Sequence, residues 1–272
     1  HELVHAAQER DIGFATFDTW IDSLDTANAT GSLIEGEAML YENLFDAKLR
    51  ALDVERIDWT GYHANWIAGT RAQIVEDKSP FRLAISGLRY PLGSRYLTSA
   101  FVEGGQLGVR RALAAHPEST AQLMAERSSA EHSPPPAWRC ADPEPPAGYQ
   151  NVYADELGAY SVYALATRVL PEQDDQAWAL ASAWNGDRFV IFATPDKQLA
   201  VLWVLRFRSG DAARALRDAL AQSPLGESVQ TVIRQNRDAA GRSTIAAGDV
   251  YVLNAPYNGG THLPDITVIT PV

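Results

Sequence analysis

A proline-rich stretch in the middle of the chain constrains the fold more than any other feature of the sequence. Its prolines cluster twice, in Ser133-Pro134-Pro135-Pro136 and in Pro143-Glu144-Pro145-Pro146. Proline lacks a backbone N–H and fixes its φ angle, so prolines at this density exclude both a helix and a central strand. We therefore predict an extended connector over residues 131–150, between a first part over residues 1–130 and a second part over residues 151–272.

The first part reads as almost entirely helical. Apolar residues recur at helical spacing from Ser32 to about Asp53 and from Trp59 to Asp77. Ser32 and Glu35 have the spacing of a capping box, so we predict that the earlier of these helices begins at Ser32, after a loop over residues 18–30. Shorter helices are predicted over residues 1–13, 94–103, 106–115 and 119–127.

The second part combines strands with helices. Residues 188–193 and 199–207 are apolar runs of strand length, and the turn formers between them predict a hairpin. Further strands are predicted over residues 228–234 and 249–253, and helices over residues 157–169, 174–183 and 211–222. The predicted fold class is therefore α+β, with a mainly helical first part and a smaller second part of antiparallel sheet and packed helices.

Charge and hydropathy argue against two classes of partner. The formal net charge is −11, and an acidic surface repels phosphate backbones, so we expect no nucleic-acid partner. The longest apolar stretch of strand character, over residues 199–205, is far shorter than the roughly 20 residues of a membrane-spanning helix, so no membrane span is expected. Cys140 is the only cysteine, and we expect an inert thiol.

The first residues of the chain, His1-Glu2-Leu3-Val4-His5, form a motif with metal-binding chemistry. On a helix, positions i and i+4 lie on one face, so the imidazoles of His1 and His5 can bind one tetrahedral zinc ion. Glu2 holds the position of the general base in HExxH enzymes, where it takes a proton from the metal-bound water. The apolar residues around the motif predict a helix buried at the base of a cleft.

A glutamate further along the chain is expected to complete the ligand set. We favour Glu35, because the following Gly36 would let two helices approach closely around a metal ion. Glu42 is the first alternative, since Glu42 and Asp46 have the spacing of a ligand and an orienting carboxylate. Glu37 is the second alternative.

Hydrolysis of a peptide also requires a hydrogen-bond donor for the oxyanion besides the metal. Tyr and His side chains commonly supply one, and Tyr90 and His63 are the candidates in this chain. For both residues, ordinary packing is the competing interpretation.

These residues resemble the gluzincins, the HExxH peptidases whose third zinc ligand is a glutamate on a following helix. Residues 35–38, Glu-Gly-Glu-Ala, resemble the Glu-Gly-x-Ala segment of the aminopeptidase N-like family, in which the first glutamate binds zinc. The resemblance is closer to a little-characterised group of bacterial and archaeal zinc-peptidase-like proteins. Their His-Glu-Leu-x-His-Ala-x-Gln helix and Glu-Gly-(Asp/Glu)-Ala segment match residues 1–8 and 35–38.

The resemblance to that group continues in patches over nearly the whole chain. Further matching segments lie at residues 89–93, 101–105, 116–122 and 183–188. One departure is found at residues 131–134, Glu-His-Ser-Pro, where the group has a His-Pro pair. The resemblance implies a zincin-like first part, a Zn²⁺ cofactor and hydrolysis of a peptide or protein substrate by a metal-bound water that Glu2 activates.

The start of the sequence and the resemblance also lead to expectations about the cellular location of the protein and about a longer precursor. The sequence begins inside the motif and without Met, so we expect a longer precursor and a periplasmic or secreted location. In gluzincins, a strand before the HExxH helix pairs with the extended substrate, so an incomplete, inactive fragment is one interpretation of the chain. Two others are a catalytically silent binding or scaffold domain of the cell envelope and a zinc hydrolase that acts on a non-peptide amide.

Overall fold

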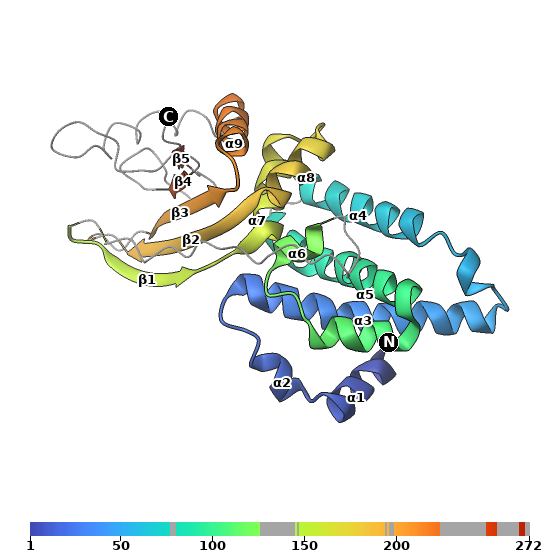
Figure 1. Cartoon of the computed structure of the whole chain (residues 1–272). Coiled ribbons are helices and arrows are strands. Elements are labelled where there is room, and N and C mark those ends of the chain that lie inside the picture. The colour runs from blue at the N-terminus through green and yellow to red at the C-terminus, as the bar shows by residue number, and fades with distance from the viewer. Residues whose placement is uncertain are drawn as a thin grey trace. The chain divides into compact units, whose positions relative to one another are not determined.

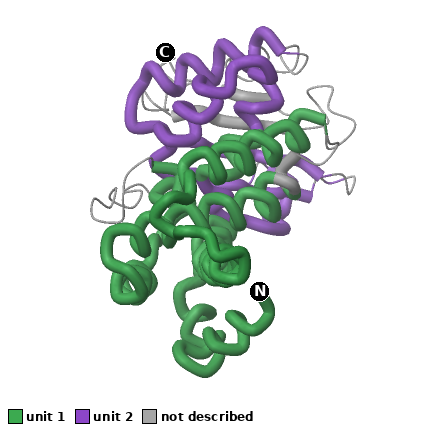
Figure 2. Tube along the Cα trace, turned by 90° about the vertical axis from the view of Figure 1, so that its right-hand side faces the viewer, with its two compact units in different colours: residues 1–135, 159–164 green, residues 136–158, 165–272 purple. Residues whose placement is uncertain are grey.

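The fold is α+β, as predicted. The computed structural model describes residues 1–76, 80–125, 145, 147–193, 195, 199–223, 249–254 and 267–269. The chain forms two compact units, which Figure 2 distinguishes by colour. Unit 1 comprises residues 1–135 and 159–164, and unit 2 comprises residues 136–158 and 165–272. Most of the predicted connector, including Cys140, lies outside the described residues.

Unit 1 is built from helices (Figure 1). In chain order they are α1 (Glu2–Asp11), α2 (Phe14–Asp18), α3 (Leu24–Leu49), the short 3-10 helix η1 (Val54–Arg56), α4 (Trp59–Glu76), α5 (Pro80–Ala114) and α6 (Thr120–Met124). Helix α5 packs against both α3 and α4. The fully buried side chains of these three helices include Leu33, Leu40, Ile74, Leu88 and Leu97, so they supply the core of the unit.

Helix α3 begins at Leu24, so the prediction of a start at Ser32 was wrong. Ser23 is the N-cap: its Oγ accepts a hydrogen bond from Thr26 N at 3.2 Å, and its backbone N donates to Thr26 Oγ1 at 3.0 Å. Ser32 is buried in the helix interior, where its Oγ donates to the carbonyl of Asn28 at 2.8 Å. The Thr and Asn residues that read as a loop are buried side chains of α3, because tertiary packing overrides weak helix propensity.

Helix α5 is longer than predicted. It runs from Pro80 through Pro91 to Ala114, and its backbone leaves helical geometry only at Gly104 and Gly105, where Gly105 has φ 57°. The helices predicted over residues 94–103 and 106–115 are therefore the two segments on either side of a kink. A positive φ of this kind favours glycine, which has no Cβ to clash with the backbone.

Helices α3 and α5 touch at the level of their backbones. A Cβ atom added to Gly93 would lie 1.7 Å from the carbonyl oxygen of Ser32, and one added to Gly36 would lie 2.2 Å from the carbonyl carbon of Gly93. Both distances are far below van der Waals contact, so only glycine permits this approach. The contact fixes the positions of Glu35 and Tyr90, which precede the two glycines on their helices.

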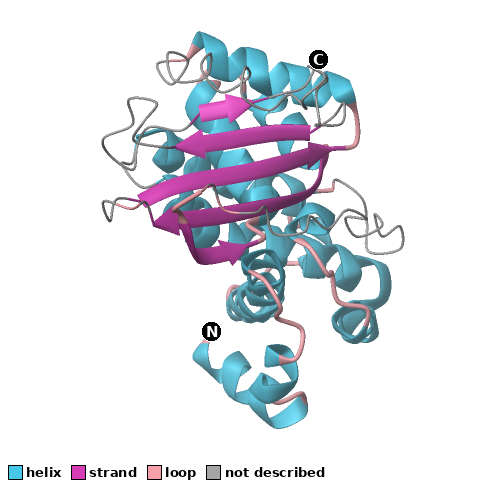
Figure 3. Cartoon of the chain, turned by 90° about the vertical axis from the view of Figure 1, so that its left-hand side faces the viewer, coloured by secondary structure: helices cyan, strands magenta, loops and turns pink. Residues whose placement is uncertain are grey.

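Unit 2 contains a five-stranded antiparallel sheet in the order β1-β2-β3-β4-β5 (Figure 3). The strands are β1 (Gln150–Asp155), β2 (Trp184–Ala193), β3 (Leu199–Phe207), β4 (Asp249–Asn254) and β5 (Thr267–Ile269). The predicted hairpin is confirmed by β2 and β3, in which Val190 pairs with Leu202. Strands β1 and β5 were not predicted, and the strand predicted over residues 228–234 lies outside the described residues.

The helices of unit 2 match their predictions within one residue at each end. They are α8 (Asp174–Ser182), α9 (Gly210–Gln222) and α7 (Gly158–Val169), whose residues 159–164 belong to unit 1. Helix α9 packs against β3 and β4. Among the described residues, no helix combines the length and the apolar character needed to cross a membrane, which agrees with the prediction.

Substitution of Gly93 tests the backbone contact between α3 and α5. We expect Gly93→Ala to destabilise the chain by about 3 kcal/mol, the upper range for overpacking, because the atom that the new methyl group meets belongs to the backbone. Gly69→Ala is the matched control, since Gly69 lies inside α4 with open space around it; it should raise the free energy of unfolding by up to about 1 kcal/mol. Urea unfolding measures the free energy of unfolding of both variants. Equal effects of the two substitutions would contradict the close backbone contact at Gly93.

Asp25 is a buried carboxylate at the start of α3. It is 2% exposed and accepts hydrogen bonds from Thr120 N at 3.1 Å and from Thr120 Oγ1. The same hydroxyl accepts a hydrogen bond from Ala159 N at 2.9 Å, so the carboxylate ties together α3, α6 and the first residues of α7 within unit 1. Burial raises the pKa of Asp25 to about 6, although the hydrogen bonds from Thr120 and Ser119 oppose the shift.

The raised pKa of Asp25 predicts a direction of pH dependence. Between about pH 4, the ordinary pKa of Asp, and pH 6, the folded state holds a proton that the unfolded state has lost. This contribution to stability is therefore complete below about pH 4 and is lost as the pH rises to about 6. The Asn side chain of Asp25→Asn stays neutral at every pH. The Tm of this variant relative to that of the wild type should therefore increase as the pH rises from 4 to 7. A Tm difference that moves the other way would show that the pKa of Asp25 is lowered.

Candidate metal centre

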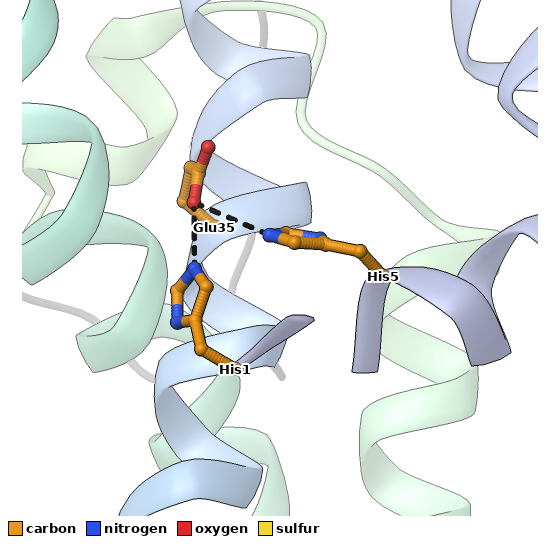
Figure 4. A group of neighbouring side chains, drawn as sticks. All are labelled: His1, His5 and Glu35. Atoms are coloured by element: carbon orange, nitrogen blue, oxygen red, sulfur yellow. Dashed lines mark hydrogen bonds and ion pairs between the residues drawn. The ribbon is translucent and has the colours of Figure 1, made fainter. Parts of the chain in front are cut away.

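His1, His5 and Glu35 lie together in unit 1, with their ligand atoms all within 4.8 Å of one another (Figure 4). His1 Nε2 is 3.3 Å from Glu35 Oε2, and His5 Nε2 is 3.7 Å from the same oxygen. His1 is the N-cap of α1, and His5 follows one turn later on that helix, whereas Glu35 lies on α3. The structure thus brings together the two histidines of the motif and the favoured glutamate.

These separations fit a tetrahedral zinc ion. With zinc–ligand bonds of roughly 2.0–2.1 Å, neighbouring ligand atoms of a tetrahedron lie about 3.4 Å apart. The distances from Glu35 Oε2 to the two imidazoles, 3.3 and 3.7 Å, bracket that value. The side chains of His1, His5 and Glu35 are 24%, 20% and 25% exposed, so all three are partly accessible to solvent.

Both imidazoles are oriented through their other ring nitrogen. His1 Nδ1 lies 3.1 Å from Glu42 Oε2, and His5 Nδ1 lies 2.8 Å from Gln8 Oε1. A carboxylate or amide oxygen accepts here, so each Nδ1 is placed to donate to it. In a neutral ring with the proton on Nδ1, the lone pair is on Nε2, the atom that faces Glu35 in each case.

Gln8 holds His5 in this orientation. The side chain is buried, and its Nε2 donates to the carbonyl of Ile34 and to Glu37 Oε2, both at 2.9 Å. These two acceptors fix the amide, so its oxygen must face His5. The sequence prediction missed this role, although Gln8 stands three residues after His5 and therefore on the same helix face.

The two alternative ligands lie outside the three-residue group. Glu37 accepts a hydrogen bond from the side-chain amide of Gln8. Burial raises the pKa of Glu37, and this hydrogen bond opposes the shift. Glu42 lies at Nδ1 of His1, on the other side of the ring from Glu35, and fits the carboxylate that orients a metal-binding histidine. Asp46, expected to be the orienting residue in the Glu42 alternative, instead accepts a hydrogen bond from Arg50 at 2.9 Å.

A cation between these three side chains would be bound by all of them. In the tautomer with the proton on Nδ1, Nε2 of both imidazoles and the facing oxygen of Glu35 are all acceptors. Acceptors at such distances repel one another unless a proton or a metal ion lies between them. The donor set of two nitrogens and one oxygen is one that zinc commonly takes in catalytic sites, which leave a fourth position for water.

Tyr90 lies beside the three ligands. Its ring centroid is 6.3 Å from that of His1, and its hydroxyl forms a hydrogen bond with Glu35. Burial, the charge of Glu35 and that hydrogen bond raise the pKa of Tyr90, and the charge of Glu2 adds to the effect. The phenol therefore keeps its proton at neutral pH and can donate a hydrogen bond. Glu2 itself is exposed at the start of α1.

His63 occupies a different environment from the one predicted for an oxyanion donor. It is buried in α4, with its Nε2 3.0 Å from Ser94 Oγ, and its ring stacks on Trp59 at 6.3 Å. Burial lowers the pKa of His63 to about 4, so the imidazole is neutral at physiological pH. These contacts support the packing interpretation.

The environment of α1 also differs from the prediction. Leu3 is 86% exposed, and Gln8 is the buried residue of the helix. The expectation of a helix buried at the base of a cleft was therefore wrong. Contacts of the polar side chains attach α1 to α3, through His1, His5 and Gln8.

Comparison with known proteins yields one partial match. A family model described as hydantoinase B/oxoprolinase matches residues 217–272, about a fifth of the chain. Of that segment the structure describes residues 217–223, 249–254 and 267–269, which belong to unit 2. The match includes none of the residues of the candidate metal centre. No curated protein and no solved structure matches the chain.

Substitutions at the three-residue group test its affinity for zinc. We expect His5→Ala and Glu35→Gln to abolish stoichiometric zinc binding, because the first removes a ligand nitrogen and the second replaces an anionic carboxylate by a neutral amide. Gln8→Ala keeps all three ligands but frees the ring of His5, and should weaken zinc binding by about 10–100-fold. Asp46→Asn, a change of an exposed carboxylate on the same helix as Glu35, is the control.

Isothermal titration with Zn²⁺ and metal analysis measure these effects, and circular dichroism checks that each variant folds. Wild-type affinity in Glu35→Gln, or an equal loss in Asp46→Asn, would contradict the ligand assignment.

Proposed function

We propose that this chain carries the zinc site of a metallopeptidase, with His1, His5 and Glu35 as ligands. The observation that supports the proposal is the convergence of three acceptor atoms at separations suited to one zinc ion. The orientation of both imidazoles by Glu42 and Gln8 adds to it, since metal-binding histidines usually donate their second N–H to such groups.

The side chains around this position suit the hydrolysis of an amide bond. When bound, zinc would lower the pKa of a water molecule towards about 7 and polarise the scissile carbonyl. Glu2, adjacent to His1 and exposed, would take a proton from the attacking water and pass it to the leaving amine. Tyr90, which keeps its proton, would donate a hydrogen bond to the oxyanion.

A peptide or protein is the proposed substrate, on the strength of the resemblance of residues 1–8 and 35–38 to gluzincin-like peptidases. The partial match to hydantoinase B/oxoprolinase at residues 217–272 favours a second candidate, the hydrolysis of a small non-peptide amide. A catalytically silent binding domain is the third. A periplasmic or secreted location remains a prediction from the resemblance.

Two substitutions separate zinc binding from catalysis. Glu2→Gln should retain zinc and lower the turnover of zinc-loaded protein by at least about 100-fold, because the amide cannot act as a base. Tyr90→Phe should lower kcat by about 100-fold with little change in KM, the effect of losing one oxyanion donor. Glu9→Gln, on the same helix as Glu2, is the control.

Turnover is measured on a peptide library with detection of new amines, and in parallel on small cyclic amides. Wild-type turnover in Glu2→Gln would refute the role of the general base. Zinc-loaded wild type that cleaves only the cyclic amides would favour the second candidate, and protein that cleaves neither would favour the silent domain.

A further inference from the structure

Glu37 lies at the end of a short series of hydrogen bonds that begins at the candidate metal centre. His5 Nδ1 is 2.8 Å from Gln8 Oε1, and Gln8 Nε2 is 2.9 Å from Glu37 Oε2. The two contacts use opposite ends of the same amide group. The carboxylate of Glu37 is therefore linked to the ring of His5 through Gln8, although Glu37 is not among the three residues of the candidate centre.

The direction of the Gln8 amide determines which proton position suits His5. With Oε1 towards the ring, as in the structure, Nδ1 donates and Nε2 keeps its lone pair for a metal ion. With the amide reversed, its NH₂ group would face Nδ1, which would then have to accept. The proton of the neutral ring would move to Nε2, the atom that faces Glu35, and that nitrogen could no longer bind a metal ion.

Two acceptors on α3 favour the observed direction of the amide. Besides Glu37, the backbone carbonyl of Ile34 accepts a hydrogen bond from Gln8 Nε2 at 2.9 Å. A reversed amide would turn Oε1 towards both, so that three acceptors would face one another. Gln8 is only 3% exposed, so water has little access to supply the missing donors. Buried acceptors without a donor are costly, and the reversed amide is therefore disfavoured.

Glu37 contributes more to this preference than the carbonyl of Ile34 does. When ionised, a carboxylate only accepts, and its hydrogen bonds are stronger than those of a neutral carbonyl. Ile34 lies inside α3, where helical geometry already supplies its carbonyl with a backbone donor. Glu37 is also half-buried, which reduces the competition from water. The charge of Glu37 is thus the main feature that distinguishes the two directions of the amide.

We propose that Glu37 is a positioning residue of the metal centre, which directs the amide of Gln8 and thereby keeps the lone pair of His5 Nε2 available. This role differs from that of a zinc ligand, the alternative that the sequence offered for Glu37. The link to a metallopeptidase rests on the proposed function, whereas the effect on the ring of His5 requires no metal.

The proton position on His5 tests the proposal in the metal-free, full 272-residue chain. Nitrogen-15 NMR in EDTA at about pH 8, where an ordinary imidazole is neutral, distinguishes a protonated ring nitrogen from one with a lone pair. The signals of His5 are those absent from His5→Ala. We expect the proton on Nδ1 in the wild type. Glu37→Gln can present either end of its amide to Gln8, and should lower the ratio of the Nδ1–H form to the Nε2–H form by about 10-fold.

Zinc affinity shows whether Glu37 acts through Gln8. Glu37→Gln keeps all three ligands and should weaken Zn²⁺ binding by about 10-fold in isothermal titration. The same substitution in a Gln8→Ala background should change the affinity by less than about 2-fold, because no amide is left to direct. Asp46→Asn, another exchange of a carboxylate for an amide on α3, is the control and should change neither the ring nor the affinity. Circular dichroism checks that each variant folds.

The design separates this proposal from the zinc chemistry. A wild-type ring with its proton on Nε2, or the same ratio of the two forms in wild type and Glu37→Gln, would overturn the proposal. An equal loss of affinity from Glu37→Gln with and without Gln8 would also overturn it, since the effect would not pass through the amide. Gln8→Ala, which removes the amide itself, should lower the ratio of the two forms as Glu37→Gln does. Such shifts of the His5 proton support the proposal even if the chain hydrolyses no peptide.

Discussion

The backbone contact between Gly36 and Gly93 determines how unit 1 is arranged. It brings α3 and α5 to a distance that no other residue type permits. Glu35 directly precedes Gly36, and Tyr90 lies one turn before Gly93, so the same contact places the carboxylate beside the phenol with which it forms a hydrogen bond. A feature of packing thus positions two groups of the candidate site.

The attachment of α1 to α3 is of a different kind. α1 buries only Gln8 and leaves Leu3 exposed, so apolar burial contributes little to its position. Helix α1 is attached by the hydrogen bond from the Gln8 amide to α3 and by the contacts of His1 and His5 with Glu35. A bound cation would coordinate His1, His5 and Glu35 together, and part of its binding free energy would then stabilise the docked helix.

The sequence predicted those features that depend on local geometry. The spacing of His1 and His5 on one helix is local, as are the apolar patterns of α4, α8 and α9. The choice of Glu35 followed from the glycine after it, but the structure assigns that glycine a different role: Gly36 approaches α5, not the histidine helix. The residue was therefore favoured for a reason that was only partly right.

The features that were missed depend on residues far apart in the chain. The start of α3 was mistaken because the burial of Asn28 and Asp25 depends on other helices, which supply partners such as Thr120. The role of Gln8 depends on Ile34 and Glu37.

Anomalous scattering at the zinc edge from a crystal of the zinc-loaded chain tests most directly whether two imidazoles and one carboxylate share a single metal ion. We expect one peak within about 2.0–2.2 Å of Nε2 of His1, Nε2 of His5 and a carboxylate oxygen of Glu35. A fully loaded crystal with no peak between these three atoms, or with zinc bound by other residues, would contradict the shared site.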